Sequence, residues 1–277
     1  MSNFGNKIIF ILLLLCLSLF LYLKSKKVDF NYNTEILELF EKKEYKFIAH
    51  AAGSFDQNIY TNSLEALNDS INKGFKLIEV DLLETKDGHF VGINTWSDFK
   101  KDNLLDKKYN NDPMSFSEFK KVNILKGYTP LTTDIINKIF SENKDLILVT
   151  DKTNNFKKIN QDFKFDNSRI IVEIFGKKNY FKSIKDGIVN PMFSASSNDY
   201  DFIIKNDIKL IAAHTKDIIK NKDVFKKIVK QGIKVMAYTS NNKKFINENL
   251  GITFSGVYTD YWDINKNDCL ALKCITY

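Results

Sequence analysis

The feature that most constrains the fold is a repeated alternation of short apolar strands with amphipathic stretches along residues 47–238. Between most of the strands, apolar residues recur at helical spacing, as in residues 63–73, 132–140 and 217–230. Eight such alternations predict one closed (β/α)8 barrel of the TIM type, an α/β fold that commonly occupies about 250 residues. The strands are predicted at residues 47–51, 77–82, 90–94, 146–150, 170–175, 189–194, 209–213 and 234–238.

An apolar run near the N-terminus, residues 8–23, contains no charge and is flanked by Lys7 on one side and Lys24, Lys26 and Lys27 on the other. A helix of this length spans about 24 Å, somewhat less than the roughly 30 Å of a bilayer core. No small-residue cleavage site follows the run. It is therefore predicted to remain as an N-terminal transmembrane helix.

The predicted domain order is a membrane anchor at residues 1–27, a linker at residues 28–44 and the barrel at residues 45–277. We expect a single-pass, membrane-anchored protein with an extracytoplasmic barrel. The lysines after the apolar run favour the opposite orientation, so the side of the membrane stays open.

The net charge of +7 raises the question of a nucleic-acid partner. The basic residues are nearly all lysine, and they are scattered along the chain among Asp and Glu. No segment gathers them with aromatic residues into a binding stripe. We therefore expect no nucleic-acid partner and favour a membrane surface.

Two cysteines near the C-terminus, Cys269 and Cys274, lie five residues apart. This spacing is compatible with a small disulfide loop and equally with two free thiols. Nothing in the chain resembles a zinc-binding spacing.

Polar residues stand at the predicted C-terminal strand ends, where barrels of this type carry their chemistry. His50 follows the first strand, and Glu79 and Asp81 lie on the second with one residue between them, so both face the same side. Paired carboxylates need a cation or a lysine to neutralise them, and oxygen ligands favour Ca²⁺ or Mg²⁺. Each of these features also has a structural explanation. The carboxylates could form a structural ion pair, and His50 could be a hydrogen-bonded residue of the core.

The motifs taken together resemble the glycerophosphodiester phosphodiesterase family, in the branch whose first motif reads His-Ala. The resemblance extends from about residue 47 to residue 260, with the motifs in the same order and spacing. They read IAHAAG at residues 48–53, TNSLEA at 61–66, EVD at 79–81, KDG at 86–88, TDK at 150–152 and GVYTD at 256–260.

This resemblance implies a (β/α)8 barrel, a divalent cation (Ca²⁺ or Mg²⁺), and hydrolysis of a glycerophosphodiester to an alcohol and glycerol phosphate. By the same resemblance His50 is one of two acid/base histidines, Glu79 and Asp81 hold the metal, and Lys152 contacts the phosphate. A phosphodiester needs its charge neutralised and its leaving oxygen protonated, and these residue types can do both. Asn62 is expected to hold the active-site loop in place beside the substrate. Alternatively, its role is limited to capping the following helix.

Three departures from the family pattern affect the site. Asn94 stands where the second catalytic histidine is expected, and an amide cannot exchange a proton near neutral pH. Thr150 stands where a third metal carboxylate is expected. Asp151 is predicted to point away from the barrel, which leaves Glu173 as the substitute ligand.

A further departure is Tyr238, at a position that is often histidine in this branch of the family. His214, at the end of the seventh strand, could face the barrel mouth or have only a structural role. We assign Tyr238 and His214, with Asn62, to substrate binding.

Two main hypotheses follow. In the first, the protein is a slow or specialised metal-dependent hydrolase of glycerophosphodiesters, with Tyr238 or His214 covering the missing step. In the second, it is an inactive member that binds glycerophosphate-containing headgroups or glycerol-phosphate polymers at a membrane. Losing one general acid–base residue costs about 10²–10⁴ in rate, which weakens turnover without abolishing it. An unrelated barrel enzyme that reuses the phosphate site is a third alternative.

Overall fold

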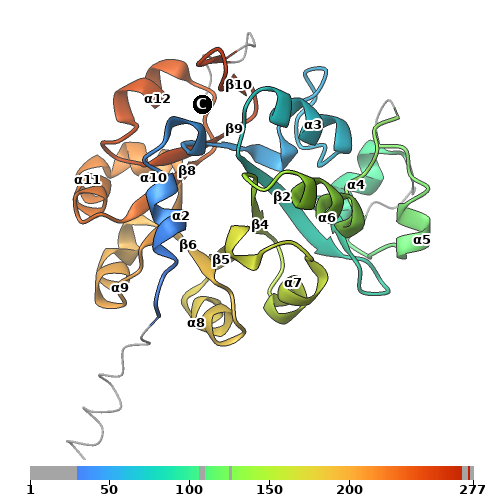
Figure 1. The fold of residues 1–277 in the computed structure, drawn as a ribbon, viewed down its shortest axis with the longest axis horizontal. Coiled ribbons are helices and arrows are strands. Elements are labelled where there is room, and N and C mark those ends of the chain that lie inside the picture. Colours follow the sequence, from blue (N-terminus) through green and yellow to red (C-terminus); the bar gives the residue numbers. More distant parts are fainter. Residues whose placement is uncertain (1–29, 106–109, 125–126, 270–273, 275–277) are drawn as a thin grey trace, which may run out of the picture. The chain divides into compact units, whose positions relative to one another are not determined.

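Eight parallel strands close into a barrel in the part of the chain that the structure describes (Figure 1). The computed structural model describes residues 30–277 except 106–109, 125–126, 270–273 and 275–277. The first strand pairs with both the second and the last, so the TIM-type barrel predicted from the sequence is confirmed. In chain order and in space, the barrel strands are β1 (Phe47–Ala49), β2 (Leu77–Glu84), β4 (Ile147–Asp151), β5 (Ile170–Phe175), β6 (Asn190–Ala195), β7 (Leu210–His214), β8 (Lys234–Tyr238) and β9 (Gly256–Thr259).

The prediction of a barrel strand at residues 90–94 was wrong. The strand found there, β3 (Phe90–Gly92), pairs antiparallel with the end of β2 and forms a hairpin outside the closed ring. The eighth place in the ring is taken by β9, which lies between β8 and β1. A short apolar run does not distinguish a hairpin strand from a barrel strand, because both have the same local pattern.

Helices follow the barrel strands and cover the outside of the ring (Figure 1). Side-chain caps start several of them: the hydroxyls of Ser63 and Thr132 accept hydrogen bonds from backbone N–H groups in the first turns of α3 and α6. The covering helices are α3 (Leu64–Asn72), α6 (Thr133–Glu142), α7 (Phe156–Asp162), α8 (Lys177–Lys185), α9 (Tyr200–Lys205), α10 (Thr215–Lys220), α11 (Lys222–Lys230) and α12 (Lys243–Asn249).

Helix α2 (Thr34–Leu39) forms within the segment predicted to be a linker. Ile36 and the following Phe40 are buried in one cluster with inward-facing strand residues such as Leu77 and Ile147. These residues begin their strands, so the cluster fills the barrel from its N-terminal end. The compact unit accordingly begins at Tyr32.

An excursion between β3 and α6 builds a small core of its own beside the barrel. Helices α4 (Trp96–Asp102) and α5 (Phe116–Phe119) supply Trp96, Phe99 and Phe119, and the rings of Phe99 and Phe119 lie 5.2 Å apart. Because Asn94 lies between β3 and α4, this excursion sets where Asn94 enters the barrel mouth.

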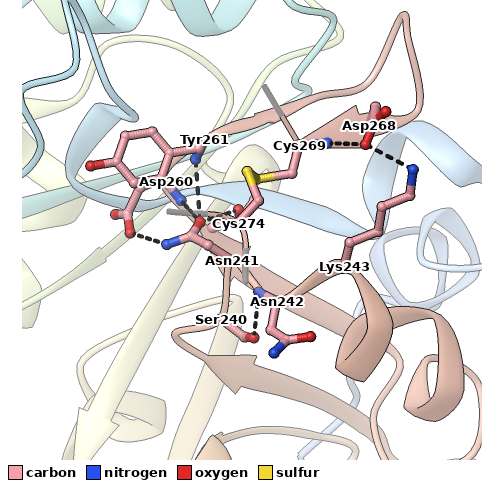
Figure 2. Close-up of a disulfide and its surroundings, with 10 residues drawn as sticks. Ser240, Asn241, Asn242, Lys243, Asp260, Tyr261, Asp268, Cys269 and Cys274 are labelled. Carbon is pink, nitrogen blue, oxygen red and sulfur yellow. Dashed lines mark hydrogen bonds and ion pairs between the residues drawn. A yellow bond between two sulfur atoms is a disulfide. The ribbon is translucent and has the colours of Figure 1, made fainter. Parts of the chain in front are cut away.

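The C-terminal segment is tied to the start of α12. After the short pair β10 (Trp262–Asp263) and β11 (Asp268–Cys269), Cys269 and Cys274 are joined in a disulfide, which decides between the two alternatives left open by their spacing (Figure 2). Lys243 pairs with Asp268 at 2.9 Å, and its N–H donates to the Cys274 carbonyl at 3.2 Å.

The predicted localisation has to be corrected. Among the described residues, none of the helices is long and apolar enough to span a membrane. This finding contradicts the expectation of a single-pass, membrane-anchored protein with an extracytoplasmic barrel. The apolar run at residues 8–23 lies outside the described residues.

We predict that the chain's one arginine, Arg169, stabilises the barrel by binding three carbonyls in the last turn of α6 and just after it. Its guanidinium donates to the carbonyls of Phe140, Asn143 and Leu146 at 2.9–3.0 Å. Lysine keeps the charge but cannot reach all three, so Arg169→Lys should cost about 2 kcal/mol. We expect the Tm to fall by about 4–8 °C in a thermal melt.

The control is the exposed Lys138 on α6, because Lys138→Met should leave the Tm unchanged. Equal melts for the Arg169→Lys variant and wild type would show that the three hydrogen bonds contribute nothing.

Candidate active site

The candidate site is a cavity of about 610 Å³ at the C-terminal ends of the barrel strands. All of the predicted site residues except Asn62 line it, although they come from most of the length of the chain. Its polar and aromatic lining includes His50, Tyr60, Glu79, Asp81, Asn94, Asp151, Lys152, Glu173, His214, Tyr238 and Tyr258.

Three buried carboxylates meet on one wall of the cavity. Glu79, Asp81 and Asp151 each offer an oxygen atom, and these atoms all lie within 4.8 Å of one another. The prediction that Asp151 points away from the barrel was wrong. In the register of β2 and β4, Asp81 is opposite Asp151, so the two side chains share a face.

Thr150 therefore turns outward, where its hydroxyl donates to the Val80 carbonyl at 2.9 Å. The sequence contains the right carboxylate, but only the strand register shows which of two adjacent residues enters the site.

The negative charge of the carboxylate cluster is only partly compensated by neighbouring residues. Burial raises the pKa of Glu79 well above its usual range, and the charges of Asp81 and Asp151 raise it further. Burial and the charge of Asp81 likewise raise the pKa of Asp151. Asp151 Oδ1 is buried and accepts no hydrogen bond from the described residues. An oxygen-only cluster with an unused buried acceptor fits a hard divalent cation.

Lys152 lies beside this cluster and at the edge of the cavity. Its Nζ is 3.1 Å from Asp151 Oδ2 and 3.4 Å from Asp81 Oδ1. Burial alone would lower the pKa of Lys152, but the two carboxylates outweigh that effect and raise it, so the ammonium stays charged. One lysine balances one of the three carboxylates.

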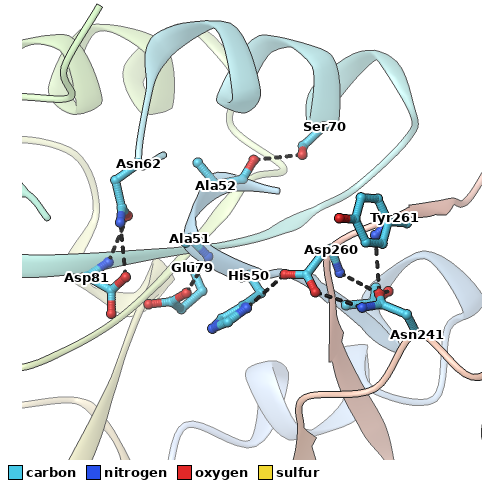
Figure 3. Close-up of polar contacts among 11 residues, drawn as sticks. His50, Ala51, Ala52, Asn62, Ser70, Glu79, Asp81, Asn241, Asp260 and Tyr261 are labelled. Atoms are coloured by element: carbon cyan, nitrogen blue, oxygen red, sulfur yellow. Dashed lines mark hydrogen bonds and ion pairs between the residues drawn. The ribbon is translucent and has the colours of Figure 1, made fainter. Parts of the chain in front are cut away.

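Asn62 lies behind the cavity wall and holds Asp81 in place. The side chain is fully buried; its Nδ2 donates to Asp81 Oδ2 at 2.9 Å, and its Oδ1 accepts from the Asp81 N–H at 3.1 Å (Figure 3). Its contact is thus with a carboxylate of the cluster. Both hydrogen bonds fix the direction in which Asp81 presents its other oxygen.

The loop after β1 is strained where it passes the cluster. Ala51, Ala52 and Tyr60 have φ values of 48°, 68° and 59°, in the left-handed region that costs non-glycine residues about 1–3 kcal/mol each. In this conformation, the Ala51 N–H donates a hydrogen bond to Glu79 Oε2 at 2.6 Å (Figure 3). Strain of this kind is typical of functional loops.

His50 is oriented by a carboxylate to which sequence reasoning assigned no role. Its Nδ1 lies 2.9 Å from Asp260 Oδ1, and Asp260 Oδ2 accepts from Asn241 Nδ2 at 2.7 Å (Figure 3). When Nδ1–H donates this hydrogen bond to Asp260, Nε2 of the neutral ring is left as the proton acceptor. The available signal was the position of Asp260, directly after the last barrel strand.

Asn94 lines the same cavity as His50, at the position where the family pattern has its second histidine. It also lines a second cavity of about 270 Å³ that shares Tyr60 with the first. The second cavity lies along α4 and carries the carboxylates of Asp98 and Asp102 and the ring of Phe99.

Glu173, the predicted substitute metal ligand, lines the cavity but does not belong to the three-carboxylate cluster. Its Oε2 accepts from the Tyr258 hydroxyl at 3.0 Å. Burial raises the pKa of Glu173, and the hydrogen bonds from Ser194 and Tyr258 oppose that effect.

Tyr238 and His214 form the opposite rim, with ring centroids 5.4 Å apart. His214 is exposed, and its Nδ1 accepts from the Lys216 N–H at 3.0 Å, so this nitrogen caps α10. Burial raises the pKa of Tyr238, so its hydroxyl keeps its proton.

Comparisons with known proteins agree with this geometry. A sequence model described as the glycerophosphoryl diester phosphodiesterase family matches residues 51–264. A search of curated proteins finds no match.

Similar solved structures include a glycerophosphodiester phosphodiesterase from Thermotoga maritima, at 18% identity and TM-score 0.61, over 80% of this chain and 96% of that chain. Another, from Parabacteroides distasonis, has 16% identity and TM-score 0.63, over 79% and 94% of the two chains. A phosphodiesterase from Oleispira antarctica, in complex with the product sn-glycerol-3-phosphate, has 17% identity and TM-score 0.60, over 79% and 94%. At these identities the likeness shows the fold.

We predict that a divalent cation reverses the pH dependence of stability. Because the pKa values of Glu79 and Asp151 are raised in the metal-free fold, their contribution to stability is present at acidic pH and is lost as pH rises through the raised values. In chelator, the Tm should therefore fall on going from acidic toward neutral pH. Millimolar Ca²⁺ or Mg²⁺ should raise it again at neutral pH.

Glu79→Gln should flatten the pH dependence in chelator and remove the rise caused by the cation. Glu248→Gln, a matched change at an exposed residue of α12, should do neither. A wild-type melt that ignores both ions at neutral pH would contradict the metal site.

Proposed function

The chain belongs to the glycerophosphoryl diester phosphodiesterase family, and on this premise we propose that it is a phosphoric diester hydrolase acting on glycerophosphodiesters. The observation that carries the proposal is the convergence of an oriented histidine, a charged lysine and a cluster of three buried carboxylates on one cavity. Each of these supports one requirement of the reaction.

The first requirement is a proton acceptor at the reacting oxygen. His50 meets it because its Nδ1–H donates a hydrogen bond to Asp260, which leaves Nε2 without a proton. The ionised Asp260 also stabilises the imidazolium that forms when Nε2 accepts a proton, as in other His–Asp pairs. Both side chains are nearly buried, which limits competition from water.

The second requirement is neutralisation of the phosphate charge. Lys152 supplies a fixed positive charge at the edge of the cavity. When bound, a divalent cation held by Glu79, Asp81 and Asp151 would add Lewis-acid stabilisation of the phosphoryl oxygens. The oxygen-only ligand set favours Ca²⁺ or Mg²⁺.

The third requirement, a proton for the leaving oxygen, is the weak point of the site. Asn94 can donate a hydrogen bond to a phosphate oxygen but cannot give up a proton. Tyr238 and His214, on the opposite rim, are side chains that can carry a proton. We therefore expect slow or specialised turnover, and assign Tyr238 and His214 to the substrate side of the cavity.

Asn94 also favours one alternative function, an inactive member that binds its ligand without cleaving it. Lys152 and a bound cation would still hold a phosphate. The ligand would then be a glycerophosphate-containing headgroup or a glycerol-phosphate polymer.

Restoring the missing histidine separates the two functions. If the rest of the site is competent, Asn94→His should hydrolyse a simple glycerophosphodiester at least about tenfold faster than wild type, the lower range of a general acid's contribution. The rate is measured as release of glycerol phosphate with Ca²⁺ or Mg²⁺ present.

Asn94→Gln is the matched control, because it changes the size of the side chain without adding a proton carrier. His50→Ala in the Asn94→His background should abolish the gain. An unchanged rate in Asn94→His, with the cation still bound, would favour the inactive alternative.

We assign the second cavity to the alcohol part of the diester, because it adjoins the main cavity at Tyr60 and Asn94. The carboxylates of Asp98 and Asp102 attract a positive charge, and the aromatic rings of Tyr60 and Phe99 suit an ammonium group. The preferred alcohol is therefore one that carries an ammonium group.

Asp98→Asn combined with Asp102→Asn should raise KM about three- to tenfold for a diester whose alcohol carries an ammonium group. KM for a diester of a neutral alcohol should not change. A double variant with the same change in net charge at the distant exposed residues Asp134 and Asp201 is the control. Equal effects on both diesters would contradict this assignment.

A further inference from the structure

Asn241, in the loop between β8 and α12, makes four side-chain hydrogen bonds near the candidate site. Its Oδ1 accepts from the Thr259 hydroxyl at 2.7 Å, the Asp260 N–H at 2.8 Å and the Tyr261 N–H at 3.3 Å. Its Nδ2 donates to Asp260 Oδ2 at 2.7 Å. Figure 3 shows Asp260 between His50 and Asn241.

The orientation of the Asn241 amide is determined by these partners. Backbone N–H groups can only donate, so the atom facing the N–H groups of Asp260 and Tyr261 must be the oxygen. The amide nitrogen therefore faces the Asp260 carboxylate. A flipped amide would lose the bonds from the two backbone N–H groups and the bond to Asp260, and it would place an oxygen against a carboxylate.

Asp260 uses both of its oxygens in this arrangement. One receives the His50 ring nitrogen at 2.9 Å and the other receives the Asn241 amide at 2.7 Å. The Asp260 side chain is only 6% exposed, so water offers little replacement for either partner. Without the amide, one oxygen would be left unpaired at a cost in free energy, and the carboxylate would be free to rotate away from His50.

We infer that Asn241 is a positioning residue for the proposed reaction: it fixes the Asp260 carboxylate and, through it, the tautomer of His50. This inference deepens the proposed function and rests on it for its catalytic meaning. Asn241 itself does not line the cavity, so it acts through Asp260.

The loop that carries Asn241 is held from its other side. Asn242 accepts from the Phe245 N–H and caps α12, and the Lys243 N–H donates to the carbonyl of disulfide-bonded Cys274 (Figure 2). The position of Asn241 is thus determined by barrel closure on one side and by the C-terminal segment on the other.

Two substitutions test the inference. Asn241→Leu removes the amide, and Asn241→Asp keeps its shape while placing an oxygen against Asp260 Oδ2. Asn137→Asp is the matched control, because Asn137 also bridges two segments, through the Asp162 carbonyl and the Lys164 N–H, but lies outside the site.

The decisive measurement is the tautomer of His50 by ¹⁵N NMR on the folded full chain, without substrate. The chain has three histidines, so the signal is assigned by its loss in His50→Ala. Wild type and Asn137→Asp should show the single neutral Nδ1–H tautomer, whereas both Asn241 variants should show a mixture. With a diester substrate, the variants should lose about ten- to hundredfold in kcat with little change in KM.

A single Nδ1–H tautomer in the folded Asn241→Asp variant would overturn the inference, and this isosteric variant decides if Asn241→Leu fails to fold. Because the tautomer is read without turnover, its outcome is independent of catalysis. If wild type cleaves no diester but the Asn241 variants lose the tautomer, the proposed hydrolase function fails while the positioning role stands.

Discussion

Closure of the barrel is the constraint on which the rest of the structure depends. β1 pairs with β9 so that Ala49 is opposite Thr259, and the next residues, His50 and Asp260, emerge side by side at the barrel mouth. These two residues are 210 positions apart in the chain. A shift of this register by one residue would turn one of the two side chains outward and separate the pair. The same logic in β2 and β4 brings Asp151 beside Asp81.

Several features of the candidate site destabilise the fold, and interactions elsewhere in the barrel must offset them. Three carboxylates are buried together beside one lysine, and the loop after β1 adopts left-handed φ values next to them. Such features persist only where the surrounding structure holds them. Here the apolar cluster from α2 to Tyr258 fills the barrel interior, and the pair of hydrogen bonds from Asn62 fixes Asp81. A bound cation would relieve the repulsion, so binding and stability should be coupled.

The two halves of the proposed chemistry have different support. His50 is positioned by two successive hydrogen-bond partners, because Asp260 orients the ring and Asn241 orients Asp260. The half around Asn94 lacks a proton carrier, yet Asn94 still lies between the main cavity and the second one along α4. This asymmetry fits a site whose binding functions are more complete than its acid–base functions.

The sequence by itself determined the barrel, the family and half of the cavity-lining residues. Strand–helix alternation is a local pattern, and each motif, such as IAHAAG at residues 48–53 or EVD at residues 79–81, is contiguous in the chain. Local patterns did not distinguish the hairpin strand β3 from a barrel strand, nor Thr150 from Asp151 as the residue facing the cavity. Only the tertiary structure decided those points, the pairing of His50 with Asp260, and the disulfide. The physical reason is that register and ring closure are set by contacts between distant strands, and these determine which face each side chain occupies.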